Sequence, residues 1–331
     1  MPLADTGIFS DRSARGLTLE LVRVTERAAI AAARLRGQGK EREADQAAVD
    51  AMRAELESLP IVGTVVIGEG ERDEAPMLYI GEVLGTGNGP EVDIAVDPLE
   101  GTTLCAKDMP GAIAVMALAE KGTLLAAPDV YMQKIAIGPG YPIGTIDLDK
   151  TPAENIAALA KAKGVEPSAL TAIILDRPRH IDLVAAVRAT GAGVRLISDG
   201  DIAAIIHTTA PEETGVDIYL GSGAAPEGVI AASALCCIGG QMQGRLILDS
   251  ADKRARAAQM GITDPNRKYD IRDMARGDVI VAATGVTDGA LLGGVRFKPG
   301  IIETETVVYR SNTGTVRRIA CEHRRPELMD R

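Results

Sequence analysis

The sequence lacks tryptophan and is poor in aromatic residues of every kind. Its 331 residues include two phenylalanines and six tyrosines, so a surface that stacks nucleic-acid bases on aromatic rings is not expected. Basic residues are also in deficit, since 36 lysines and arginines stand against 46 aspartates and glutamates, for a net charge of −10. A chain of this sign repels a nucleic-acid backbone. We therefore predict no nucleic-acid partner and consider metal ions as partners of the surplus carboxylates.

Long apolar runs are absent too. The longest, Ala112–Ala119 and Val229–Ile238, are well short of the roughly 18 residues that span a bilayer, and the N-terminus has no apolar stretch resembling a secretory signal. The four cysteines form neither a CxxC pair nor a zinc spacing, and two of them are adjacent. These features predict a chain without a membrane partner, in the reducing cytoplasm.

Several catalytic signatures are missing. There is no GxxxxGK[ST] phosphate loop and no GxSxG elbow, and the three histidines form no metal-type pair. The stretch GTGNGP places Pro90 where a dinucleotide fingerprint requires its third glycine. Nucleotide kinase, dehydrogenase, zinc hydrolase and serine hydrolase functions therefore have no support.

The pattern of apolar residues predicts a mixed α/β chain. Residues 17–59 show helical spacing, which the charged stretch RLRGQGKEREAD divides into two helices. Runs typical of strands follow at 63–67, 92–96 and 113–119. The segment Thr151–Gly164 predicts a helix that starts at TPAEN, with Thr151 as cap, proline at the first position and Glu154 three residues after the cap. From there onward strands and helices alternate. The turn-rich stretch GPGYPIGTIDLDKTP predicts a boundary, with an N-terminal α+β lobe over 1–150 and a C-terminal α/β lobe over 151–331.

The densest acidic segment is IGEGERDEAPM, at residues 67–77. Gly68 and Gly70 flank Glu69, so the backbone can bend and present this carboxylate at a strand end. Taken alone, the segment is more simply a solvated acidic loop.

A second acidic segment, VDIAVDPLEGTT, ends an apolar strand with Asp97. Glu100 follows on a turn restricted by Pro98, and Gly101 and Thr102 come directly after it. Two carboxylates on a rigid turn can bridge hard cations such as Mg²⁺ or Mn²⁺, although a capped turn explains this segment equally well. Combined with Glu69, the pair would suffice to hold ions that neutralise a phosphate monoester and activate water.

Two further segments, LDRPRH and SDGD, follow predicted strands. Arg177 and Arg179 could grip a phosphate through forked hydrogen bonds. Asp199 and Asp201 have acceptors for sugar hydroxyls, but ordinary turn chemistry accounts for Asp-Gly-Asp as well.

Two other carboxylates have ordinary local explanations. Glu227 follows a proline in a predicted first helical turn, where the helix dipole favours it. Asp45 is a lone aspartate on a helix, which is more often solvated than a ligand.

The segment VDPLEGTT resembles the Asp-Pro-x-Asp/Glu-Gly-Thr signature of the lithium-sensitive, metal-dependent sugar phosphatase superfamily. With IGEGERDEAPMLYIGE, DRPRH, SDGD, APEG, TGVTDGALLGGV and RSNTGTVR in order, the chain resembles class II fructose-1,6-bisphosphatases of the GlpX type from about Leu19 to about Arg318. The resemblance implies an α/β fold with two lobes, layered α-β-α-β-α. Most metal ligands would lie in the first lobe, and the second would carry substrate-binding residues and one metal ligand.

The resemblance also assigns roles to residues. The implied ligands of Mg²⁺ or Mn²⁺ are Asp45, Glu69, Asp97, Glu100 and Glu227, and only the resemblance gives this role to Asp45 and Glu227. Thr102 would orient the attacking water, with Glu69 and Asp97 also in the catalytic set. The implied substrate contacts are Glu100, Gly101, Thr102, Tyr131, Arg177, Pro178, Arg179, Asp199, Gly200, Asp201 and Ala224. Ala224 replaces the usual glycine of the family.

The implied activity is hydrolysis of the 1-phosphate of fructose 1,6-bisphosphate to fructose 6-phosphate and phosphate. Sedoheptulose 1,7-bisphosphate, alone or as a second substrate, stays open, because one extra carbon is a small change for such a site. An inositol-phosphate phosphatase and a non-catalytic sugar-phosphate sensor are further alternatives. The GEGE, DRPRH and PEG motifs argue against the former, and the intact carboxylates and Thr102 against the latter. Members of the family are commonly dimers or tetramers, so a homo-oligomer is expected. The sequence does not choose between Mg²⁺ and Mn²⁺.

Overall fold

The computed structural model describes residues 16–70 and 76–324. The chain forms two compact units, Met1–Leu124 with Arg276–Arg331, and Leu125–Ala275. This division differs from the predicted lobes, because a C-terminal strand, β11 (Val279–Gly285), pairs with β4 (Ile113–Glu120) and so joins the N-terminal sheet. None of the described helices is long and apolar enough to cross a membrane.

The first unit holds a mixed sheet in the order β12-β13-β11-β4-β3-β1-β2. Strand β14 pairs antiparallel with β13 along most of its length and forms an edge of this sheet among the described strands. The elements are α2 (Leu17–Ala33), α3 (Glu41–Glu57), β1 (Val62–Ile67), β2 (Val83–Leu84), β3 (Glu91–Glu100), α4 (Thr102–Ala106), β4, β11, β12 (Arg296–Lys298), β13 (Ile301–Arg310) and β14 (Thr315–His323).

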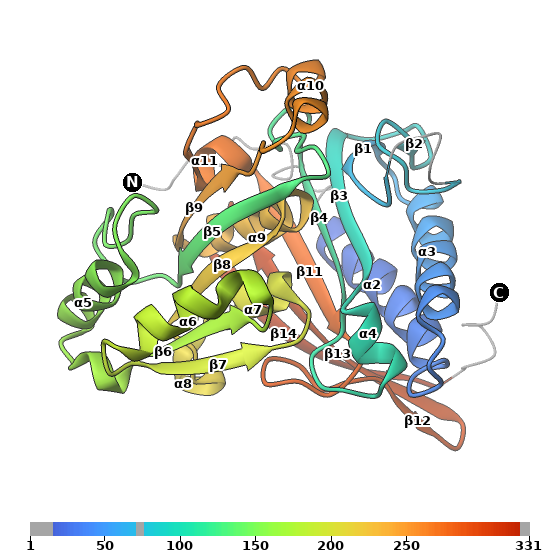
Figure 1. The fold of residues 1–331 in the computed structure, drawn as a ribbon. Helices are drawn as coiled ribbons and strands as arrows, with labels where there is room; N and C mark the ends of the chain where they lie inside the picture. Colours follow the sequence, from blue (N-terminus) through green and yellow to red (C-terminus); the bar gives the residue numbers. More distant parts are fainter. Residues whose placement is uncertain (1–15, 71–75, 325–331) are drawn as a thin grey trace, which may run out of the picture. The chain divides into compact units, whose positions relative to one another are not determined.

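Helices α2 and α3 confirm the two helices expected within residues 17–59. The stripe of Leu17, Leu21 and Val24 is buried, and α2 packs on β4, β11 and β13. Between the helices, Gly37 and Gly39 adopt φ angles of 72° and 70°, which glycine tolerates best. The chain therefore reverses there, and Figure 1 shows the two helices side by side in blue.

The second unit holds another mixed sheet, in the order β10-β9-β5-β8-β6-β7. Strands β7, β6 and β8 are parallel, and β5, β9 and β10 run antiparallel to their neighbours. Figure 1 shows α6 and α7 in yellow-green over β6 and β7. The elements are β5 (Tyr131–Ile137), α5 (Pro152–Lys163), β6 (Thr171–Leu175), α6 (Ile181–Arg188), β7 (Gly193–Ile197), α7 (Asp201–His207), α8 (Pro211–Thr214), β8 (Ile218–Ala224), α9 (Ala225–Ile238), β9 (Gln241–Leu246), α10 (Ala251–Gln259), β10 (Tyr269–Asp270) and α11 (Ile271–Met274). With two mixed sheets and their helices, the predicted layered α/β class is confirmed.

The start of α5 follows its sequence closely. Thr151 accepts a hydrogen bond from the Glu154 backbone N–H at 3.2 Å, and the Glu154 carboxylate accepts from the Thr151 N–H at 2.8 Å. This reciprocal capping box satisfies two N–H groups that a helix start otherwise leaves unpaired. Gly164 ends the helix at φ 73°, so both ends agree with the prediction.

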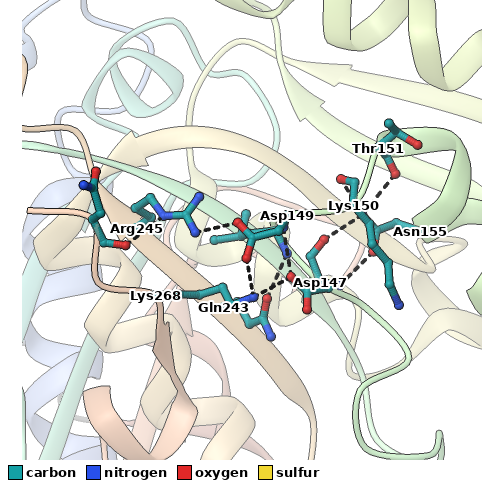
Figure 2. Close-up of polar contacts among 10 residues, drawn as sticks. Asp147, Asp149, Lys150, Thr151, Asn155, Gln243, Arg245 and Lys268 are labelled. Carbon is teal, nitrogen blue, oxygen red and sulfur yellow. Dashed lines mark hydrogen bonds and ion pairs between the residues drawn. The ribbon is translucent and has the colours of Figure 1, made fainter.

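An ion-pair cluster fixes the connection that leads into α5 (Figure 2). Lys268 Nζ lies 2.6 Å from Asp147 Oδ1 and 2.7 Å from Asp149 Oδ2. Arg245 Nη2 lies 2.6 Å from Asp149 Oδ1, and Asn155 Oδ1 accepts from the Asp147 N–H at 2.8 Å. The hydrogen bond from Lys268 is the main reason that the pKa values of both aspartates lie below their usual range. The cluster thus ties this connection to the sheet of its own unit.

We expect Lys268→Met to destabilise the protein at pH 7 but not in acid. A carboxyl whose pKa is lowered on folding contributes stability above its unfolded pKa and loses it as pH falls through the folded pKa. The difference in urea midpoint between wild type and variant should therefore shrink below about pH 4. Lys150→Met, in the same exposed stretch, is the matched control. A difference that persists unchanged at pH 3 would contradict this account.

Candidate active site

A β-bulge in β3 determines where the acidic pair of the DPLEGTT segment points. Asp97 pairs with Val115 of β4, whereas Glu100 pairs with Ile113. Three steps along β3 therefore match two steps along β4, and the extra residue falls at Pro98–Leu99. Because Val115 and Ile113 share a face of their strand, Asp97 and Glu100 do as well. Oxygens of the two carboxylates lie within 4.8 Å of each other.

The turn after the bulge requires glycine. Gly101 has φ 82° and ψ 52°, and a Cβ there would lie 2.9 Å from Leu104 Cδ1. Helix α4 begins at Thr102, whose half-buried side chain directly follows the acidic pair. The Leu99 N–H donates to Asp97 Oδ1 at 3.1 Å and fixes one carboxylate. Glu100 is buried and Asp97 is half-buried.

Asp45 and Glu69 form a second acidic pair in the first unit. Asp45 lies half-buried on α3, and Glu69 follows β1 on a backbone held by its N–H bond to the Leu78 carbonyl at 3.0 Å. Burial raises the pKa of Asp45. Burial, and secondarily the charge of Asp45, raises the pKa of Glu69 to about 7, although Glu69 keeps access to solvent. Residues 71–75 of this acidic segment lie outside the described chain.

These carboxylates fit a hard divalent cation. Among the described residues, no basic side chain offsets the raised pKa of Asp45 or Glu69. A carboxylate is costly to ionise where protein partly shields it from water and no cation lies nearby. Mg²⁺ and Mn²⁺ prefer oxygen ligands, and a bound ion would supply the missing positive charge.

The predicted substrate-binding residues of the second unit lie at the end of its sheet where the parallel strands finish. The carboxyl ends of the parallel strands β6, β7 and β8 lead into Arg177–Arg179, Asp199–Asp201 and Ala224. Strand β5 is antiparallel to β8 and begins at Tyr131, which pairs with Ala224. This end of the sheet therefore brings together segments that are distant in sequence, at the position where open α/β sheets bind ligands.

Arg179 is held in place by two neighbours. Its guanidinium carbon lies 4.7 Å from the centre of the Tyr131 ring. Its Nε donates to Ser222 Oγ at 3.0 Å and its Nη2 donates to the Ser222 carbonyl at 2.7 Å. Arg177 is oriented differently, because its Nη1 donates to the carbonyl of Asp176. Exposed Pro178 separates the two arginines and begins a short 3₁₀ helix.

His180 and Ser222 support this turn, and no local sequence pattern indicated either role. The Ser222 N–H donates to His180 Nε2 at 2.9 Å, so the other ring nitrogen, Nδ1, carries the hydrogen and donates to the Leu175 carbonyl at 2.8 Å. Burial lowers the pKa of His180 and so favours the neutral ring. The pair therefore locks the strand end from which Arg179 extends.

A buried lysine positions Asp201. Lys134, on β5, forms an ion pair with Asp201 Oδ2 and donates to the Ala224 carbonyl at 2.9 Å. The Tyr219 hydroxyl lies 3.4 Å from the same carboxylate oxygen. A Cβ on Gly223 would collide with this carboxylate, so glycine is required there. Gly200 caps α7 at φ 87°, and half-buried Asp199 precedes it.

Glu227 lies in the first turn of α9, but the helix dipole does not account for its burial. Its Oε2 is buried and has no hydrogen-bond partner among the described residues. Burial, followed by the charge of Asp201, raises the pKa of Glu227 to about 7, and Lys134 offsets this in part. An orphaned buried carboxylate oxygen is an atom that a bound cation would satisfy.

Ala224, which replaces a glycine of the family pattern, adopts φ −65° and ψ 148°. Any residue adopts this extended conformation, so the methyl group introduces no backbone strain.

Comparison with known proteins identifies relatives over nearly the whole chain. Residues 15–323 match the family model described as bacterial fructose-1,6-bisphosphatase, glpX-encoded. A protein of Synechococcus sp. strain JA-3-3Ab is 46% identical over 93% of this chain and 95% of its own length. One from strain RCC307 is 46% identical over 94% of this chain and 97% of its own. Both are named D-fructose 1,6-bisphosphatase class 2/sedoheptulose 1,7-bisphosphatase.

We expect Lys134→Met to lower the free energy of unfolding by about 3–5 kcal/mol, because it leaves the buried Asp201 carboxylate without its cation. The double variant Lys134→Met/Asp201→Asn should regain part of this loss. Urea denaturation of the wild type, both single variants and the double variant measures the coupling. Additive effects of the two substitutions would show that the pair does not stabilise the fold.

The raised pKa values predict how metal binding depends on pH. Glu69 and Glu227, with pKa values of about 7, bind protons more tightly in the folded than in the unfolded state. The stability that these two groups contribute to the metal-free protein should therefore fall as pH rises from about 4.5 to 7.5. Mg²⁺ needs the deprotonated carboxylates, so its stabilising shift in Tm should be larger at pH 8 than at pH 5.5. A shift of equal size at both pH values would contradict these assignments.

Proposed function

The chain belongs to the family of bacterial, glpX-encoded fructose-1,6-bisphosphatases, and on that premise we propose that it hydrolyses the 1-phosphate of fructose 1,6-bisphosphate to fructose 6-phosphate and phosphate. The observation that carries this proposal is the bulge that turns Asp97 and Glu100 to one face, directly before Thr102. A carboxylate pair followed by a hydroxyl suits a cation-assisted attack of water on a phosphate ester.

Our proposal for the reacting end of the substrate uses the first unit. Asp45, Glu69, Asp97 and Glu100 would hold Mg²⁺ or Mn²⁺, with Glu227 of the second unit as a further proposed ligand. When bound, such ions neutralise the dianionic phosphate and lower the pKa of water. The Thr102 hydroxyl accepts a hydrogen bond from the attacking water while it donates to a carboxylate, and so orients the water for attack.

The remainder of the substrate would contact the second unit. Two N–H groups of Arg179 bond to Ser222, which leaves the outer part of its fork to bind the distal phosphate. Arg177 adds a second positive charge on the same turn. Lys134 fixes Asp201, and the carboxylates of Asp201 and Asp199 accept hydrogen bonds from sugar hydroxyls. Tyr131 and Ala224 complete the contacts at this end of the sheet.

A second substrate, sedoheptulose 1,7-bisphosphate, is favoured by the names of the relatives. We also propose that the enzyme is a cytoplasmic homo-oligomer, a dimer or a tetramer, without nucleic-acid partners. Size-exclusion chromatography with light scattering tests the assembly.

Initial rates of phosphate release from both bisphosphates, with Mg²⁺ and with Mn²⁺, test the proposed activity. Thr102→Ala should lower kcat by about 10²-fold or more, and Thr102→Ser should recover much of it, because general acid–base and orienting groups contribute on this scale. Asp45→Asn should weaken metal activation, whereas Asp50→Asn, on the exposed side of α3, should not. Wild-type protein that releases phosphate from neither bisphosphate, or full activity in Thr102→Ala, would overturn the proposal.

A further inference from the structure

A mixed cluster of metal-ligating side chains lies in the first unit, away from its acidic pairs in sequence. Cys321 and His323 are two residues apart on β14 and so share a face of the strand. Helix α2 presents Glu26 to them, and one donor atom from each of the three lies within 4.8 Å of the others. His323 Nε2 and Glu26 Oε1 are 3.8 Å apart.

Glu26 is buried largely among neutral groups. It is 4% exposed and His323 is 9% exposed. Thr304 Oγ1 donates to Glu26 Oε1 at 2.9 Å and lies 3.1 Å from His323 Nε2, and the Cys321 thiol is a further partner of Glu26. A divalent cation would stabilise this carboxylate far more than hydroxyl and thiol donors can.

The three donors match a borderline-soft cation and not Mg²⁺. Cysteine sulfur, imidazole nitrogen and carboxylate oxygen are the usual ligands of Zn²⁺, whose bonds of about 2.0–2.3 Å place neighbouring ligands about 3.3–3.8 Å apart. The donor atoms, which lie within 4.8 Å of one another, therefore need to approach by at most about 1.5 Å to fit the ion.

Cys321 is half-buried and lies on the edge strand β14, so solvent reaches the cluster at this edge of the sheet. Solvent that reaches Cys321 can supply water as a fourth ligand and gives a metal ion its entry path.

We propose that Glu26, Cys321 and His323 bind Zn²⁺ or a similar borderline-soft divalent cation, with water as the fourth ligand. Binding breaks the S–H bond of Cys321, releases its proton to solvent and forms a metal–sulfur bond. The site uses none of the residues assigned to the hydrolytic reaction. Its role is to fasten the edge strand β14 to α2.

Cd²⁺ is the probe, because its bond to a thiolate gives an ultraviolet charge-transfer absorption that carboxylate sites do not give. The chelator-treated full chain is titrated with Cd²⁺ in excess Mg²⁺, which occupies oxygen-ligand sites. We expect the absorption to saturate at about one Cd²⁺ per chain, to vanish in Cys321→Ser and to persist in Cys236→Ser. Zn²⁺ should raise the Tm of the wild type and not of Cys321→Ser.

Two variants in which Cys321 is retained distinguish a three-ligand site from a single reactive cysteine. Glu26→Gln and His323→Gln should each weaken Cd²⁺ affinity by about tenfold or more. Unchanged affinity in both variants would mean that the thiol binds alone and would overturn the proposal. It would also fail if the wild type shows no charge-transfer absorption, or if the absorption persists in Cys321→Ser. In either case the cluster is only a hydrogen-bonded contact between α2 and the sheet.

Discussion

The extra residue in β3 opposite β4 is the constraint on which the candidate active site depends. In a regular strand, residues three apart face opposite sides of the sheet, so Asp97 and Glu100 would be separated by the backbone. The bulge at Pro98–Leu99 removes this separation, and Gly101 then turns the chain into α4 with Thr102 at its start. Paired β3 and β4 strands in a buried sheet hold this irregular backbone in place. The local geometry of these three candidate site residues therefore follows from one inserted residue.

In the second unit, a buried lysine compensates the charge of a buried carboxylate and so fixes its position. Lys134 reaches Asp201 and the Ala224 carbonyl at the end of the sheet where β5, β8 and α7 meet. It leaves Glu227 with one oxygen that no described residue satisfies. Lys134 thus fixes one carboxylate, while the other keeps an atom free for a ligand. Arg179 shows the same division, since Ser222 and Tyr131 hold part of its guanidinium and leave the rest accessible.

Local signals in the sequence predicted much of the fold, including α2, α3 and the capping box of α5. They did not predict β5, because Gln133 and Lys134 interrupt its apolar pattern and the partners of Lys134 are distant in sequence. The lobe boundary near residue 150 missed the return of β11 to β4, which no local pattern encodes. Likewise, Cys321 and His323 carry no zinc spacing, because Glu26 comes from the other end of the chain. Local chemistry in the sequence was enough to suggest Glu69, Asp97 and Glu100 as metal ligands. Asp45 and Glu227 were suggested only by the family resemblance.

We propose that the bulge in β3 aims Asp97 and Glu100 at a catalytic cation. The most direct measurement is the anomalous scattering of Mn²⁺ in crystals of the full chain. The account predicts a peak about 2.0–2.3 Å from oxygens of both carboxylates. A Mn²⁺ peak that contacts neither carboxylate, in crystals where both side chains are ordered, would contradict it.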